Sequence, residues 1–165
     1  MKIMNTEPLK QEDYEQVKEI YLEGIATGNA TFETNAPEWE EWDKNHLKHS
    51  RIVIKNGEEV IGWAALSTVS GRCVYGGVAE VSVYVKASEW GKGIGKTLLA
   101  HLIEESENNN IWTLQAGIFP ENLSSIKIHK DSGFREVGFR EKIGKMNDTW
   151  RDIILLERRS ERIGR

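Results

Sequence analysis

The stretch Val81-Ser-Val-Tyr-Val85, followed after a short spacer by Trp90-Gly-Lys-Gly-Ile-Gly-Lys-Thr-Leu-Leu99, predicts an apolar strand that runs through a glycine-rich turn into an apolar helix. The glycines at positions 91, 93 and 95 remove side chains from the turn, so several backbone N–H groups can point at one anion. The helix that follows adds the positive end of its dipole. Lys92 and Lys96 add cationic charge at the same place. The segment therefore predicts a phosphate-binding loop.

The spacing of the glycines distinguishes between three kinds of phosphate-binding loop. A Walker A loop needs a glycine where the chain has Trp90, although Gly95-Lys96-Thr97 would supply its second half. A dinucleotide-binding loop needs its third glycine one residue later than Gly95. A third pattern, x-x-Gly-x-Gly at a strand-to-helix junction, fits Gly93-Ile94-Gly95. The alternative to all three is a glycine-rich turn that only connects two elements.

Length and composition indicate one ordinary globular domain. The 165 residues are 39% hydrophobic and 29% charged, and a chain of this length buries roughly two-thirds of its unfolded surface. The net charge of −4 argues against a nucleic-acid partner, because nonspecific phosphate binding needs a basic surface. We expect a single domain over residues 1–158, followed by a basic, solvated tail at 159–165.

Cysteine and histidine content bear on compartment and metals. Cys73 is the only cysteine, which excludes an internal disulfide and suits a reducing compartment. No apolar run reaches the length of a membrane span, and the N-terminus has no apolar signal core, so we expect a cytoplasmic protein without a membrane partner. His46 and His49 lie three residues apart on an expected helix face, but no cysteine or carboxylate pattern joins them, and we expect no metal.

Apolar periodicity and turn signals predict the order of helices and strands. Asn56-Gly57 and Asn147-Asp148 mark hairpins, and Gly133 suits a left-handed helix cap. The order predicts an α/β fold with a mixed central sheet flanked by helices. Strands are expected at 2–8, 51–55, 60–68, 77–86, 111–119, 135–145 and 149–158, and helices at 11–25, 37–49, from the glycine loop to about 106, and at 122–132.

Glu80 is the candidate catalytic base. Side chains alternate along a strand, so Glu80 shares one face with Ser82 and Tyr84, and three valines share the other face. Burial in such an apolar strand raises the pKa of a carboxyl group and makes it a better base near neutrality. Acylation of an amine needs such a base, because an ammonium has no lone pair until it loses a proton. The alternative is an edge-strand glutamate in a surface ion pair.

The x-x-Gly-x-Gly loop resembles the pyrophosphate loop of the GNAT acetyltransferases, which bind acetyl-CoA, and the expected order of elements matches the GNAT acyltransferase fold. Trp90 departs from that family, which usually has Gln or Arg there. Within the family, the chain resembles the phosphinothricin and methionine sulfoximine N-acetyltransferases. This resemblance runs from about Ile3 to Leu156 and rests on three segments: Asn29-Ala-Thr-Phe-Glu33, Arg72-Cys-Val-Tyr75 and Ala79-Glu-Val-Ser-Val-Tyr-Val85.

The resemblance implies roles for residues around the glycine loop. His129 stands where many acetyltransferases place a tyrosine that protonates the leaving thiolate; it could donate that proton, contact CoA only, or pack within its helix. The catalytic residues implied are Glu80 and His129. The acetyl-CoA-binding residues implied are Val83, Tyr84, Val85, Gly91, Lys92, Gly93, Ile94, Gly95, Lys96, Asn122 and Lys130. The substrate-binding residues implied are Phe32, Glu33, Arg72, Tyr75 and Arg151.

One departure concerns the last strand. Phosphinothricin acetyltransferases often have Trp-His-Asp there, with a substrate-side role for the histidine, whereas this chain has Trp150-Arg-Asp152. Arg151 cannot act as a base, so the resemblance implies that it neutralises an acidic substrate instead. Arg72 would clamp a carboxylate or phosphinate with two hydrogen bonds, unless it is simply solvated.

The chain is therefore expected to be an acetyl-CoA-dependent transferase that acetylates the α-amine of a small amino acid, such as phosphinothricin, methionine sulfoximine or methionine sulfone. The alternatives are a GNAT enzyme for polyamines or protein N-termini, a non-catalytic CoA-binding module, and a nucleotide-dependent phosphotransferase. The family resemblance also implies a homodimer.

Overall fold

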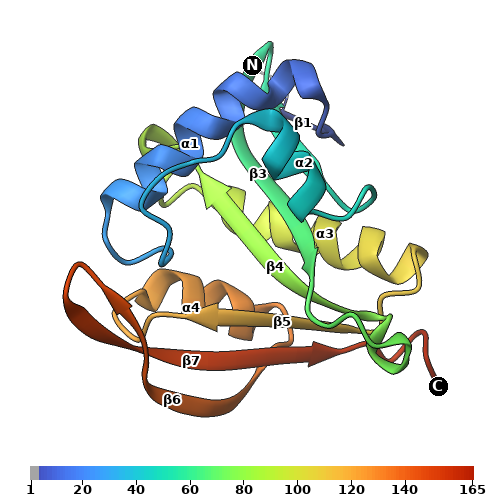
Figure 1. Ribbon diagram of the computed structural model, residues 1–165. Helices are drawn as coiled ribbons and strands as arrows, with labels where there is room; N and C mark the ends of the chain where they lie inside the picture. Colours follow the sequence, from blue (N-terminus) through green and yellow to red (C-terminus); the bar gives the residue numbers. More distant parts are fainter. Residues whose placement is uncertain (1–3) are drawn as a thin grey trace.

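A seven-stranded mixed sheet forms the centre of the computed structural model, which describes residues 4–165 (Figure 1). The strands lie in the order β1-β2-β3-β4-β5-β7-β6, and neighbours are antiparallel except β4 and β5, which run parallel. The expected α/β class with a mixed sheet is confirmed. The strands span Met4–Pro8 (β1), Ile52–Asn56 (β2), Glu59–Thr68 (β3), Val78–Val85 (β4), Thr113–Ile118 (β5), Arg135–Met146 (β6) and Thr149–Arg159 (β7).

Helices cover both faces of the sheet because its strands carry apolar side chains on both faces. In β2, Ile52 and Ile54 pack with α3, whereas Val53 between them packs with α1 and α2. The helices span Tyr14–Ala26 (α1), Trp39–Asn45 (α2), Ile94–Asn108 (α3) and Leu123–Asp131 (α4), with 3-10 turns at Gln11–Asp13 (η1), Cys73–Tyr75 (η2) and Ala87–Glu89 (η3).

The helix expected over residues 37–49 is wrong at its C-terminal end. It stops at Asn45, because His46 adopts an extended backbone with φ −120° and ψ 153°. His46 and His49 therefore do not share a helix face; His46 instead stacks on Trp42, with ring centroids 4.1 Å apart. The helix expected from Gln11 begins as η1. The first two residues of the strand expected at 2–8 lie outside the described residues.

The turn predictions are confirmed by the backbone. Asn147 and Asp148, between β6 and β7, have φ values of 49° and 63°, as a type I′ hairpin turn requires. Gly57 in the β2–β3 turn has φ 68°, and Gly133 after α4 has φ 93°. These left-handed positions explain why Asn, Asp and Gly occur there.

The two parallel strands touch only at one end. Val78–Glu80 of β4 pairs with Thr113–Gln115 of β5, and beyond that point the strands separate, as Figure 1 shows. Two backbone hydrogen bonds lie at the start of the paired stretch: the carbonyl of Gly77 accepts from the N–H groups of Trp112 (2.8 Å) and Thr113 (3.0 Å). The separation leaves the last residues of β4 without a neighbouring strand on one side.

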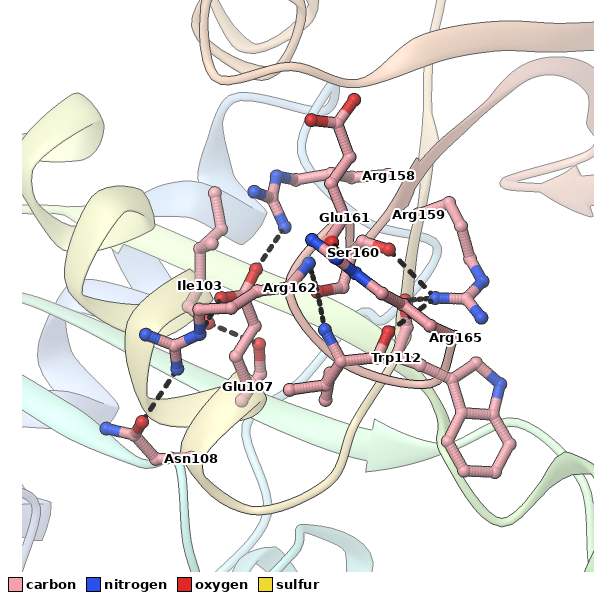
Figure 2. Close-up of polar contacts among 12 residues, drawn as sticks. Ile103, Glu107, Asn108, Trp112, Arg158, Arg159, Ser160, Glu161, Arg162 and Arg165 are labelled. Carbon is pink, nitrogen blue, oxygen red and sulfur yellow. Dashed lines mark hydrogen bonds and ion pairs between the residues drawn. The ribbon is translucent and has the colours of Figure 1, made fainter.

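The C-terminal tail makes specific polar contacts with the protein (Figure 2), although Arg159, Glu161, Arg162 and Arg165 stay exposed. Glu107, near the end of α3 and only 8% exposed, forms ion pairs with Arg158 (2.9 Å) and with Arg162 of the tail (2.9 Å). Arg162 also donates to Asn108 (2.8 Å). Arg159 donates to carbonyl groups of the tail, including Ile163 (3.1 Å). Arg158 and Arg162 therefore complement one buried carboxylate.

Over the described part of the chain, residues 4–165, no helix combines the length and apolar character that crossing a membrane requires.

Candidate functional site

A cavity of about 1050 Å³ opens where β4 and β5 separate. Its wall is built by the loop after α1, by β4, by the glycine loop and the start of α3, by the end of β5, by α4 and by β6 and β7. The volume lies at the upper end of the range usual for ligand sites. A single cavity thus joins the glycine loop to Glu80.

The free edge of β4 supplies backbone hydrogen-bonding groups to this cavity. The N–H of Lys86 donates to Ile61 of β3 (2.9 Å), so in this antiparallel ladder the backbone groups of even-numbered residues face β3. Those of Val81, Val83 and Val85 therefore face the gap. The indole N–H of Trp90 donates to the carbonyl of Val85 (2.9 Å). Val83 keeps both backbone groups available, and Val85 keeps its N–H.

The glycine loop presents the unpaired amides of a helix N-terminus. Gly93, with φ 81°, is the N-cap of α3 and has no capping side chain, and the N–H of Thr97 bonds to its carbonyl (3.1 Å). The N–H groups of Ile94, Gly95 and Lys96 precede that bond, so the helix offers them no carbonyl partner. A Cβ atom on Gly93 would meet no described atom within 4 Å. The space beside the loop is open to a ligand.

Glu80 lies at the point where the strands part. It is the last residue of β4 that pairs with β5, and its Oε1 lies 3.8 Å from where a Cβ of Gly117 would be. The side chain is half-buried, and no hydrogen bond or ion pair reaches it from residues 4–165. Burial raises the pKa of this carboxyl above its ordinary value of 4.5. The alternative of a surface ion pair does not describe its surroundings.

His129 in α4 also lines the cavity, and its hydrogen bond identifies its tautomer. Nδ1 lies 2.7 Å from the carbonyl oxygen of Ser125. A carbonyl only accepts, so Nδ1 carries the proton, and Nε2 of the neutral ring is an acceptor. Burial lowers the pKa of His129, which favours the neutral form. At neutral pH this histidine offers a hydrogen-bond acceptor rather than a proton.

The structure brings most of the expected residues to the cavity wall. Asn122 caps α4 by accepting from the N–H of Ser125 (3.3 Å), and its Nδ2 donates to the carbonyl of Asn29 (3.2 Å). Phe32 packs edge-on against Phe119, with centroids 4.9 Å apart. The expected residues that line the cavity are Phe32, Glu33, Glu80, Val83, Tyr84, Val85, Gly91, Gly93, Ile94, Gly95, Lys96, Asn122 and His129.

The expected residues outside the lining are all cationic or paired with a cation. Lys92 pairs with Glu89 (3.1 Å) and Lys130 with Glu136 (3.4 Å). The guanidinium of Arg72 lies 5.6 Å from the ring of Tyr75, and both residues are exposed. Arg151 is held by other protein groups. Roles for these residues in binding stay predictions.

Arg140 of β6 lines the cavity, although no sequence motif selected it. It stands opposite Ile153 of β7, next to an irregularity in the pairing between Arg140 and Gly144. The N–H of Lys142 in this irregular stretch donates to Oδ1 of Asp152 (2.7 Å). The Asn147-Asp148 turn predicts that β6 pairs with β7, but no local pattern shows that Arg140 reaches the cavity. Within residues 4–165, no group of three or more His, Cys, Asp or Glu side chains could hold a metal ion.

Known proteins with the same arrangement are acetyltransferases. YwnH of Bacillus subtilis strain 168, provisionally named a phosphinothricin acetyltransferase, is 33% identical over 151 residues, which cover 88% of this chain and 93% of YwnH. L-methionine sulfoximine/L-methionine sulfone acetyltransferase of Pseudomonas paraeruginosa is 31% identical over 99 residues, 60% of this chain and 58% of that protein. A phosphinothricin acetyltransferase from Sinorhizobium meliloti, crystallised with acetyl-CoA, matches with a TM-score of 0.84 at 26% identity, over 98% of this chain and 95% of its own.

A family model described as the acetyltransferase (GNAT) domain matches residues 7–155. The resemblance in the glycine loop and in the order of elements is thereby confirmed, as is the GNAT fold. With the match spanning nearly all of the sheet and every helix, the chain belongs to the GNAT acetyltransferase family and is an N-acetyltransferase.

Proposed function

We propose that this protein transfers the acetyl group of acetyl-CoA to the α-amine of a small amino acid such as phosphinothricin, methionine sulfoximine or methionine sulfone. The observation that carries the proposal is one cavity in which a glycine-rich helix N-terminus and an unpartnered, half-buried carboxylate, Glu80, lie on the same wall. The names of the relatives support the class of substrate.

The part of the cavity beside the glycine loop and β4 suits acetyl-CoA as the acetyl donor. The amides of Ile94, Gly95 and Lys96, together with the open space at Gly93, fit a pyrophosphate at a helix N-terminus. The free backbone groups of Val83 and the N–H of Val85 fit an extended chain with amides of its own, such as a pantetheine arm. When bound, acetyl-CoA supplies an activated acetyl thioester.

Glu80 is the general base of the proposed reaction. An α-ammonium must lose its proton before nitrogen can attack, and the raised pKa of Glu80 brings its basicity closer to that of the amine than an ordinary carboxylate has. The proton passes to a carboxylate oxygen of Glu80, directly or through a water molecule. A backbone N–H of β4 that faces the gap would stabilise the developing oxyanion.

His129 serves the site as a neutral group. With Nδ1 committed to Ser125, its Nε2 accepts a hydrogen bond from the bound molecules. Protonation of the leaving thiolate by His129 requires the imidazolium form, which burial disfavours. We therefore propose a positioning contact for His129 and a solvent proton for the thiolate.

Two further proposals concern the cellular compartment and the oligomeric state. The single cysteine, Cys73, supports a reducing, cytoplasmic compartment. Exposed apolar side chains on the β6–β7 hairpin, Val137, Phe139 and Trp150, support a homodimer.

Release of the CoA thiol tests the proposal. The purified protein is mixed with acetyl-CoA and one acceptor at a time: phosphinothricin, methionine sulfoximine, methionine sulfone, spermidine and a peptide with an N-terminal alanine. We expect turnover with at least one of the first three at a higher kcat/KM than with the others. Turnover only with spermidine or the peptide would show that the substrate is not a small amino acid. Stabilisation by ATP instead of acetyl-CoA in a thermal-shift assay would contradict acetyl-CoA as the donor.

A further inference from the structure

Arg151 of β7 is surrounded by protein groups that occupy its guanidinium. Its side chain is 13% exposed. Nη1 donates to the carbonyl oxygen of Gly28 (2.8 Å), and Nη2 donates to Oδ1 of Asn29 (2.8 Å) and lies 3.3 Å from Oε2 of Glu121. One face of the guanidinium stacks on Phe119, 4.0 Å from the ring centroid. Little of the group remains free for a substrate.

These contacts join segments that are far apart in the sequence. Gly28 and Asn29 follow α1, Glu121 precedes α4, and Arg151 belongs to β7. The hydrogen bonds that the loop after α1 makes within itself are short-range: the N–H of Asn29 donates to Thr27 (3.1 Å), and the N–H of Glu33 donates to Thr31 (3.1 Å). Such local bonds do not fix a loop against the rest of the molecule. Long-range bonds do: Asn122 donates to the carbonyl of Asn29 (3.2 Å), and Arg151 adds two shorter bonds, to Gly28 and Asn29 (2.8 Å each).

The loop held by Arg151 is one wall of the cavity. Asn29, Thr31, Phe32 and Glu33 all line it. Phe32 is wedged between Phe119 and Gly144, where a Cβ atom would come within 2.8 Å of the Phe32 ring. Phe119 therefore has Arg151 on its face and contacts Phe32 edge-on. A displacement of Arg151 is transmitted to Phe32 through this one ring.

We propose that Arg151 is a positioning residue, which clamps loop 27–33 against β5 and β7 and thereby shapes the wall that receives the amino-acid substrate. The guanidinium suits this task because its planar fork reaches two acceptors at once while its face stacks on an aromatic ring, which an ammonium cannot do. The inference rests on the proposed function for its substrate, but the clamp itself is a property of the fold.

The test replaces Arg151 with Met, which keeps length and apolar contact but removes every donor. We expect KM for the amino acid to rise about tenfold, KM for acetyl-CoA to stay within about twofold, and amide hydrogen exchange in loop 27–33 to accelerate. Arg151→Lys should recover part of the loss. Arg135→Met is the matched control, because Arg135 lies on the same hairpin, is 69% exposed and pairs with Glu157 (2.8 Å) on the neighbouring strand; it should leave both KM values unchanged.

Asn29→Ala separates a clamp from direct substrate binding. It removes one acceptor of Arg151 without touching the arginine, so it should raise KM for the amino acid and accelerate hydrogen exchange in loop 27–33. Because Asn29 itself lines the cavity, the deciding readouts are this exchange and an effect on KM that does not add to that of Arg151→Met. The proposal is overturned if Asn29→Ala leaves KM and loop exchange unchanged while Arg151→Lys keeps full affinity for acidic substrates. If Arg151→Met fails to fold, Asn29→Ala still decides. If the wild type acetylates no amino acid, the proposed function fails, and hydrogen exchange alone decides the clamp.

Discussion

Glu80 shows how far a single residue can be understood from its neighbours in the sequence. Alternation along an apolar strand placed it on the face opposite the three valines, and the structure confirms this division: Tyr84 packs with the α1 cluster, whereas Val81, Val83 and Val85 pack with the α3 cluster. What the sequence could not show is that β5 leaves β4 immediately after Glu80. The cavity that Glu80 lines opens at this separation.

The pH dependence of kcat/KM should report the state of Glu80. A general base must be deprotonated, so activity falls as pH decreases through its pKa. Because burial raises this pKa above 4.5, we expect the acid limb of the kcat/KM profile to lie at a higher pH than an ordinary glutamate would give. Thiol release between pH 5 and 9 at fixed ionic strength measures it. A profile without an acid limb above pH 4.5 would contradict the assignment.

The positions of two arginine side chains relative to the cavity could not be predicted from the sequence. Arg151 was expected at the substrate because of its place in a motif, yet the structure surrounds it with Gly28, Asn29 and Phe119. Arg140 was not expected, yet it lines the cavity. The reach and partners of a long cationic side chain depend on which segments the fold brings near it, and a local pattern does not contain that information.

At the scale of elements, the glycine loop and α3 follow closely from the sequence. Gly93 was expected to provide an anion site, and it lies at the N-cap of α3 with open space beside it. Trp90, which departs from the family pattern, has a local explanation: its indole N–H ties the loop to the last carbonyl of β4. The short α2 could not be predicted, because His46, whose extended backbone ends it, also meets the edge of Trp63 in β3, a contact that the local sequence does not show.

Gly93→Ala should weaken acetyl-CoA binding about tenfold by two routes. A Cβ atom is strained at φ 81°, and it would occupy the open space where the phosphates are expected. Gly57→Ala is the control, because Gly57 has φ 68° and equally open surroundings but lies in the β2–β3 turn, away from the cavity. Calorimetric titration should show the loss in Gly93→Ala only. Equal losses in both variants would mean that backbone strain, and not the loop, is responsible.

At the scale of the whole molecule, two apolar clusters hold the sheet between its helices, and Arg162 of the tail pairs with Glu107 of α3. The clusters could be anticipated from the apolar alternation of the strands. The ionic contacts at the C-terminus could not be anticipated. Glu107 lies in α3, far in the sequence from its partners Arg158 and Arg162, and only the fold brings them together (Figure 2). Sequence therefore predicts elements and faces well here, and predicts long-range ionic contacts poorly.

The stability of the molecule should depend on pH through its partly buried His46. His46 is stacked between Trp42 and the edge of Trp63, and burial lowers its pKa below the ordinary value of 6.5. The unfolded chain then binds a proton more readily than the folded one, so the free energy of unfolding should fall as pH decreases below about 6.5. Urea unfolding at pH 7.5 and 5.5 measures the difference.

His46→Gln should reduce this loss of stability on acidification, whereas His101→Gln, at an exposed position on α3, should leave it unchanged. Equal losses of the free energy of unfolding in both variants and the wild type between the two pH values would show that His46 is not responsible.

The most direct test of the whole account is the rate of thiol release by Glu80→Gln with saturating acetyl-CoA and the preferred amino acid at pH 7.5. The substitution keeps the size of the side chain and removes only its basicity. We expect kcat to fall about 100-fold or more, with the affinity for acetyl-CoA measured by titration within about twofold of the wild type. A Glu80→Gln enzyme that turns over at the wild-type rate would contradict the account.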